Sequence, residues 1–108
     1  MKRVRILPSA WDDLDKIENW YLKEFGVETA LKVSSNLLST IDRLEIFPDS
    51  GSLVPDEYLN ALGYRMVICK KHVAIFKKEG EKIYVYHIAD SKTDYTELFY
   101  GENSDKKA

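Results

Sequence analysis

The chain has 108 residues and a formal net charge of −2, and hydrophobic and charged residues make up 44% and 31% of it. This length suits one domain with a modest core, and this balance excludes a chain that is disordered throughout. The pI of about 5.7 supplies no overall attraction to nucleic acid.

The sequence contains no clustered metal ligands and no segment typical of membrane targeting. The single cysteine, Cys69, lies in an apolar stretch and has no partner for an intrachain disulfide, so we expect it to pack as a small hydrophobic side chain. His72 and His87 are separated and form no ligand motif with it, so we expect no metal and no cofactor. The N-terminal segment is basic but has no signal-peptide core, and no apolar run reaches membrane-spanning length. We therefore expect a cytoplasmic protein.

The first half of the chain predicts a strand followed by two helices. Alternation over residues 3–7 indicates a short strand that Pro8 ends. An apolar stripe at three- and four-residue steps predicts a helix over about 10–25, with Ser9 and Asp12 as a capping pair and Gly26 as the stop. A second stripe predicts a helix over about 30–44, and the two helices should form an antiparallel hairpin. Trp11 and Trp20 flank the first stripe and are expected in the core between helix and sheet, or on a partner surface if exposed.

The second half changes to a period of two. Residues 48–62 show no clear period and indicate a long loop, with room for a helical turn. Alternation over 64–69, 73–76 and 83–88 predicts three antiparallel strands, with turns at 70–71 and 79–81. A short helix is expected over 95–100, and the polar tail 101–108 is expected to be disordered.

The order of these elements predicts an α+β domain over residues 1–100. The N-terminal strand and the helix hairpin should pack on one face of a four-stranded antiparallel sheet, with the short helix at the C-terminus. The second face should lie partly open, and Arg65 should project there.

Several strings, in this order and spacing, resemble the RelE/ParE toxin superfamily over about residues 2–100. The strings are Leu7-Pro8-Ser9-Ala10 followed by Asp13-Leu14, the stretch from Leu44 to Gly51, Gly63-Tyr64-Arg65, the strand from Val73 to Phe76, and the strand from Ile83 to Ile88 leading to Lys92, Asp94 and Tyr95.

The resemblance implies a toxin of a type II toxin–antitoxin module, which a cognate antitoxin protein neutralises. RelE-like members cut messenger RNA on the ribosome without a metal, whereas ParE-like members bind and poison DNA gyrase. The principal expectation is the RelE-like activity, a ribosome-dependent mRNA endoribonuclease that inhibits translation. The alternatives are a ParE-like gyrase inhibitor and a degenerate toxin that only binds its antitoxin.

The resemblance also implies site residues. Arg65 matches the strand arginine that meets the scissile phosphate in the ribonucleases. Lys92 lies near the position of a second arginine, with the same charge but without the planar two-pronged donor. Tyr95, or alternatively Tyr100, matches an aromatic residue that stacks on a base. Metal-free cleavage also needs a base and an acid, and Glu57 and His87 are the candidates.

Other features of the sequence favour the alternatives. The segment Asp56 to Asn60, shortly before Gly63, is acidic where ribonuclease members often carry lysines, and the basic run after the last strand is reduced to Lys92. Each candidate also has a simpler interpretation: Arg65 and Glu57 as solvated side chains, and His87 as a residue packed on the sheet. The absence of the lysines favours the gyrase inhibitor.

Overall fold

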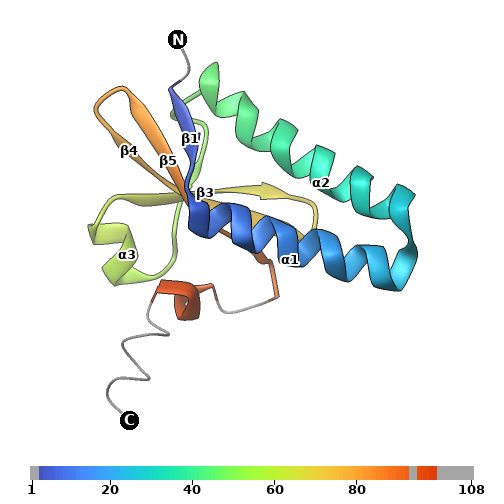
Figure 1. Cartoon of the computed structure of the whole chain (residues 1–108). Coiled ribbons are helices and arrows are strands. Elements are labelled where there is room, and N and C mark those ends of the chain that lie inside the picture. Colours follow the sequence, from blue (N-terminus) through green and yellow to red (C-terminus); the bar gives the residue numbers. More distant parts are fainter. Residues whose placement is uncertain (1–2, 93–94, 100–108) are drawn as a thin grey trace.

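The computed structural model describes residues 3–92 and 95–99 (Figure 1). Its elements in chain order are β1 (Val4–Ile6), α1 (Pro8–Phe25), α2 (Val27–Asp42), a 3-10 turn η1 (Arg43–Glu45), β2 (Ser52–Leu53), α3 (Glu57–Ala61), β3 (Tyr64–Cys69), β4 (His72–Glu79) and β5 (Lys82–Asp90). A further helical turn covers residues 96–99. The expected tail 101–108 and Tyr100 lie outside the described residues.

The two predicted helices form the expected hairpin. Gly26, with a φ of 96°, ends α1 and begins α2, and its backbone N–H donates to the Leu22 carbonyl at 3.1 Å. A positive φ of this kind suits glycine because a Cβ would be strained there. The predicted apolar stripes bury Leu14 of α1 and Leu37 and Ile41 of α2 against the sheet.

The start of α1 differs from the expected capping pair. Leu7 is the N-cap residue, without a side-chain cap, and Pro8 is the first helical residue. Ser9 lies inside the helix, and its hydroxyl donates to the Tyr86 carbonyl of β5 at 2.6 Å. The predicted cap is therefore wrong, because Ser9 bonds to the sheet instead of to its own helix.

The sheet confirms the α+β class but differs in detail from the four antiparallel strands expected. It has five strands in the order β1-β5-β4-β3-β2 within the described residues. The β1 strand runs parallel to β5, with Val4 opposite Ile83, and the short β2 pairs with β3 inside the segment expected to be a loop. Alternation within a strand indicates which residues share a face, but it does not indicate whether the strand runs parallel or antiparallel to its neighbour, which depends on the connections between strands.

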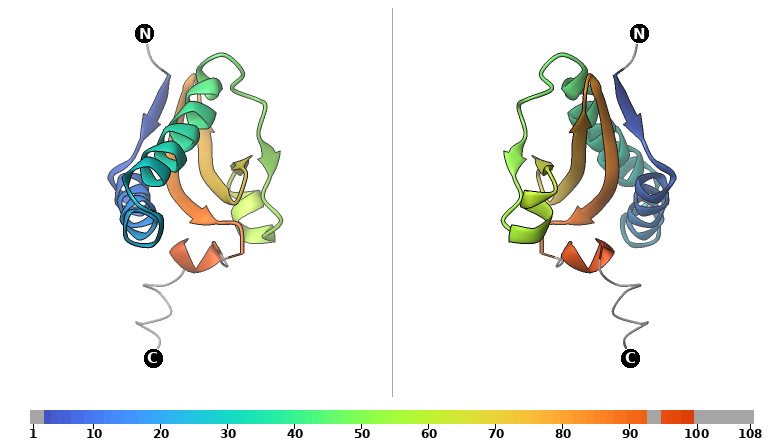
Figure 2. Two further views of the ribbon diagram at one scale, coloured as in Figure 1. Left: turned by 90° about the vertical axis from the view of Figure 1, so that its right-hand side faces the viewer. Right: turned by 90° about the vertical axis from the view of Figure 1, so that its left-hand side faces the viewer.

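Both faces of the sheet carry a hydrophobic core. The α1–α2 hairpin covers one face, where Phe76, Val85 and Leu37 are buried. On the other face, Val54, Leu59 and Ile75 form a second cluster against which Tyr95 and Phe99 pack. Figure 2 shows the helix hairpin on one side of the sheet and α3 on the other. The second face is therefore less open than expected.

Within residues 3–92 and 95–99, no helix combines the length and the apolar character needed to cross a membrane.

Candidate functional site

Arg65 lies on the face of the sheet that the α1–α2 hairpin covers. It is directly opposite Phe76 of β4, and directly opposed residues project to the same face. Its guanidinium Nη1 donates to the Gly51 carbonyl at 3.2 Å, next to β2. The expectation that Arg65 projects from the open face is therefore wrong, because its strand neighbours Val67 and Cys69, which share its parity, pack into the helix-side core.

Lys92 is exposed and follows the C-terminal end of β5. Its backbone N–H donates to Asp90 Oδ1 at 2.8 Å. Asp90 pairs with His72, whereas Arg65 pairs with Phe76, so the two levels are four strand residues, or about 13 Å, apart along β4. The β5 and β3 strands are also separated by β4. The backbones of the two candidate cationic residues, Arg65 and Lys92, therefore lie on different strands and at different ends of the sheet.

Tyr95 and Glu57 lie on the face of the sheet away from the α1–α2 hairpin. The Tyr95 hydroxyl accepts a hydrogen bond from the backbone N–H of Asp56 at 3.4 Å, and Glu57 is the next residue, the first of α3. Tyr95 is half-buried against the second core cluster, whereas Glu57 is exposed. The Tyr95 ring thus fastens the C-terminal turn to the segment before α3.

His87 is held between α1 and the C-terminal turn. Its Nδ1 lies 2.7 Å from Asp13 Oδ2, and its ring meets the Phe99 ring edge-on at 4.9 Å between centroids. The same Asp13 oxygen accepts the backbone N–H of Ile88 at 3.0 Å. His87 is thus partly packed, in agreement with its simpler interpretation, and its contacts join three elements.

The five candidates do not form one cluster. Tyr95 contacts the residue before Glu57, and His87 contacts the same C-terminal turn through Phe99, but Arg65 lies on the other face and Lys92 at the end of β5. Cleavage would require a cation and an acid–base pair around a single phosphate. The catalytic roles of these residues stay predictions.

An apolar groove of about 540 Å³ lies where the helix hairpin meets the β1 edge of the sheet, between β1, α1 and α2. Trp11 from α1 and Leu31 from α2 line it and are 45% and 59% exposed. Between them, α2 presents the small side chains of Ser35 and Ser39. Trp11 is therefore not in the core, and an exposed groove with apolar walls is a candidate partner-binding surface.

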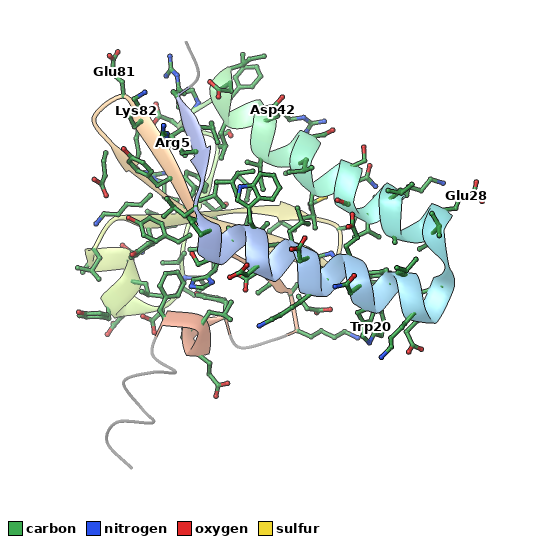
Figure 3. All side chains as sticks on the ribbon, viewed as in Figure 1. Arg5, Trp20, Glu28, Asp42, Glu81 and Lys82 are labelled. Carbon is green, nitrogen blue, oxygen red and sulfur yellow. The ribbon has the colours of Figure 1, made fainter. Side chains whose placement is uncertain are left out.

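Other exposed apolar side chains lie near the closed end of the hairpin. Trp20 is 53% exposed, and Figure 3 shows it on the side of α1 away from α2. Phe25 and Val27, which flank Gly26, are more than half exposed. Trp20 is half a turn from Trp11 around α1 and does not line the groove, so of the two flanking tryptophans it is Trp11 that marks the groove in the sequence.

Burial shifts the pKa values of three groups on the sheet. It lowers the pKa of His72, which is packed edge-on against the Tyr21 ring, and Lys71 lowers it further while Asp90 opposes the shift. Burial also raises the pKa values of Tyr64 and Tyr86, whose rings meet edge-on at 5.1 Å. Both phenols therefore stay protonated at neutral pH and act as packing groups.

Comparison with known proteins identifies the family of this chain. A family profile described as the ParE toxin of the type II toxin–antitoxin system parDE matches residues 4–95. The chain belongs to the ParE toxin family. It is also 33% identical over 88 residues to Toxin ParE1 of Caulobacter vibrioides (strain ATCC 19089 / CIP 103742 / CB 15), which covers 82% of this chain and 88% of that protein.

A solved structure supports the ParE assignment at the level of the fold. A chain from the chromosomal ParDE toxin–antitoxin system of P. aeruginosa superposes with a TM-score of 0.70 at 25% identity, over 83% of this chain and 96% of that one. The ParE match runs from β1 through Tyr95 and so includes every labelled element. The protein is a toxin of the ParDE type II class.

Proposed function

We propose that this ParE family member acts by binding DNA gyrase and inhibiting it, without a catalytic site of its own, and that a cognate antitoxin holds it inactive. Gyrase is the typical target of ParE toxins, whereas the ribosome and mRNA are targets of the RelE-like branch. The ParE profile over residues 4–95 is the observation that carries this choice.

The geometry of the candidate residues supports a binding protein over a ribonuclease. The Arg65 guanidinium is engaged with a backbone carbonyl beside β2, and Lys92 stands at the far end of β5. Inhibition by binding needs complementary shape and charge but no base, acid and cation around one phosphate. The separation of these groups is thus compatible with gyrase inhibition and unfavourable for RNA cleavage.

The apolar groove beside Trp11 and Leu31 is our candidate surface for the antitoxin. An amphipathic helix places apolar side chains on one face at three- and four-residue spacing, and a groove between two helices and a strand receives such a face. The serines along α2 allow a partner backbone to approach closely. Exposed apolar area of this extent on a small chain is explained by a partner that covers it.

The target is tested with purified toxin and purified gyrase. Toxin alone should inhibit supercoiling of relaxed plasmid and accumulate cleaved plasmid, and toxin mixed with its antitoxin should do neither. In cells, induction should reduce DNA synthesis first, with abundant messages intact by primer extension. Full gyrase activity together with messages cut within translated codons would instead identify a ribonuclease.

The Lys92→Ala variant separates the two mechanisms in one chain. Lys92 is exposed, so its removal should change the free energy of unfolding by no more than about 0.5 kcal/mol. A ribonuclease that uses this cation on the phosphate should lose most of its cutting, whereas we expect inhibition of gyrase to stay within about twofold. Lys82→Ala, at the opposite end of β5, is the matched charge control.

A further inference from the structure

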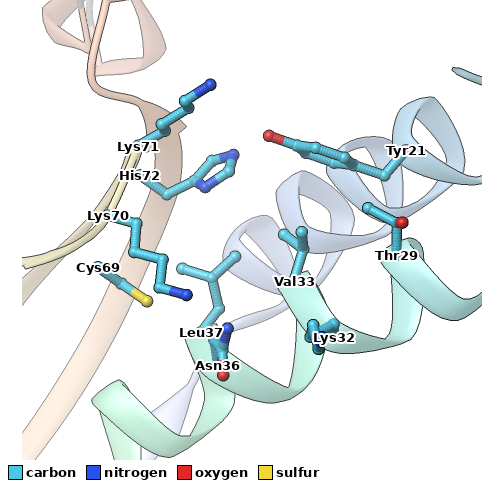
Figure 4. Close-up of a pocket in the computed structure, with 10 residues that line it drawn as sticks. All are labelled: Tyr21, Thr29, Lys32, Val33, Asn36, Leu37, Cys69, Lys70, Lys71 and His72. Atoms are coloured by element: carbon cyan, nitrogen blue, oxygen red, sulfur yellow. The ribbon is translucent and has the colours of Figure 1, made fainter. Parts of the chain in front are cut away.

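A second concave site lies on the inner side of the hairpin, between α2 and the turn that joins β3 to β4 (Figure 4). Its volume is about 230 Å³, and among the described residues its lining includes Lys32, Lys70, Lys71 and His72 but no Asp or Glu. The chain as a whole carries more acidic than basic residues. The gathering of three lysines in one concavity is therefore a local departure from the overall charge.

The polar groups of this pocket are suited to donate hydrogen bonds to an anion. The lysine ammonium groups donate only, and the Asn36 amide and the Thr29 and Tyr21 hydroxyls can also donate. Val33 and Leu37 supply an apolar floor. In Figure 4, Lys70 extends from the turn toward Asn36 and Leu37. A concave surface of one charge sign focuses the field and concentrates counter-ions.

The turn that carries the lysines is held in a strained conformation. Lys70 has a φ of 55°, and no other non-glycine residue among those described has a positive φ. Tight hairpin turns use Gly, Asn or Asp at such positions, because a longer side chain is disfavoured there. The Ser91 N–H donates to the Lys71 carbonyl at 2.7 Å and fixes the turn from β5. A strained lysine held in place at a pocket edge is a feature expected of a ligand site.

We propose that this pocket binds the phosphate group of a nucleotide, either free or within a nucleic-acid strand. A phosphate has several acceptor oxygens and, as a terminal monoester, more than one negative charge, which suits the several donors of this lining better than a single carboxylate does. The pocket volume is below the range of about 300–1,000 Å³ for drug-sized ligands, so the pocket holds the phosphate and part of the attached nucleoside. The apolar floor accommodates that part of the nucleoside.

Calorimetric titration of the purified chain at low salt tests the proposal with adenosine monophosphate, adenosine, a six-nucleotide single strand and a glutamate-rich peptide. The monophosphate should bind saturably and adenosine should not. The double variant Lys32→Gln/Lys70→Gln should weaken binding at least tenfold. Lys78→Gln, which removes a lysine six residues, or about 20 Å, along β4 from His72, should stay within twofold.

The Lys70→Gly variant guards against a loss of folding. Glycine suits the positive φ, so this variant should fold at least as well as the original chain and still lose about tenfold in affinity. Tighter binding of the strand than of the monophosphate would assign the phosphate to nucleic acid, and the reverse to a free nucleotide. The proposal is overturned if no phosphate probe saturates, if the peptide binds as well as the monophosphate, or if Lys70→Gly leaves affinity unchanged. Gyrase is absent from these titrations, so the outcome is independent of the proposed target.

Discussion

Two polar residues of α1 complete the edge of β5 where β1 stops. The Leu7 N–H still donates to the Val85 carbonyl, and then Ser9 donates to the Tyr86 carbonyl and Asp13 accepts the Ile88 N–H. Residues four apart lie on the same face of a helix, so Ser9 and Asp13 reach the same strand edge. Side chains of α1 thus replace the missing strand partner and satisfy backbone groups that would otherwise be left unpaired in a part-buried position.

Replacement of Asp13 by alanine should destabilise the protein by about 1–3 kcal/mol, because it leaves the buried Ile88 N–H without an acceptor. His87 loses its carboxylate contact in the same variant. Asp12→Ala is the matched control, since it removes the same charge from an exposed neighbour, and it should change stability by less than about 0.5 kcal/mol. Urea unfolding measures both, and equal losses would show that the strand-edge bond contributes nothing.

His72 should make the protein sensitive to mild acid. Burial lowers its pKa in the folded state below the ordinary value of 6.5, so the unfolded chain binds the proton first as pH falls. Stability is therefore fully present above about pH 6.5 and declines as pH falls through the folded-state pKa, by up to about 1.4 kcal/mol for each unit of pKa difference.

The His72→Gln variant should reduce this decline. The free energy of unfolding is measured by urea titration at pH 7.5 and pH 5.5 for each protein, and the difference between the two pH values is compared. Any cost of the substitution itself cancels within each protein. An identical decline in both proteins would mean that other groups cause the acid sensitivity.

At the scale of elements, the segment between α2 and β3 is ordered by close packing against the sheet. It forms β2 and α3, and Asp56 caps α3 by accepting the Leu59 N–H at 3.0 Å. Gly51 lies directly over the Phe76 ring, where a Cβ would come within 2.4 Å of Cζ and 3.1 Å of the Met66 carbonyl oxygen. This glycine allows the segment to approach β3 closely enough for β2 to pair.

Gly51→Ala should therefore cost about 1–3 kcal/mol, because the buried Phe76 ring must move away from the added methyl group. The control is Ser50→Ala at the exposed neighbouring position, which adds no atoms and should be nearly neutral. Thermal unfolding of both variants checks the difference. A neutral Gly51→Ala would indicate that the Phe76 ring adjusts freely.

At the scale of the whole molecule, the helix hairpin separates two surfaces of different character. The apolar groove beside Trp11 lies between the hairpin and β1, and the basic pocket beside Lys70 lies between the hairpin and the β3–β4 turn. The sheet face away from the hairpin is covered by α3 and the C-terminal turn. A toxin with this layout can present separate surfaces to an antitoxin and to a phosphate-bearing ligand.

The double variant Trp11→Ala/Leu31→Ala should weaken antitoxin binding at least tenfold. Both side chains are about half exposed in the unbound chain, so truncation should affect the complex more than the fold, and large apolar anchors dominate binding energy. Phe47→Ala, an exposed apolar residue outside the groove, is the control and should bind normally. Co-purification and calorimetry measure the effect. Equal binding by all three proteins would place the antitoxin elsewhere.

Local elements and the class of protein follow from the order of the residues alone. The stripes of α1 and α2 and the alternation of β3, β4 and β5 are properties of single segments and follow from periodicity, and the stop at Gly26 follows from the preference for glycine at a helix end. The strings that resemble the RelE/ParE superfamily indicated a toxin, which the ParE match confirms.

Which residues meet depends on how the segments pair and pack in three dimensions. Alternation divides the residues of a strand into two sets but does not say which core each set enters, so Arg65 was assigned to the wrong face. A register shift opposite Ile75 and Phe76 also changes which residues of β5 project to each face. Lys32 and Lys70 are 38 positions apart, and packing of α2 against the β3–β4 turn brings them into one pocket. Periodicity acts within a segment, whereas sites arise from pairing and packing between segments.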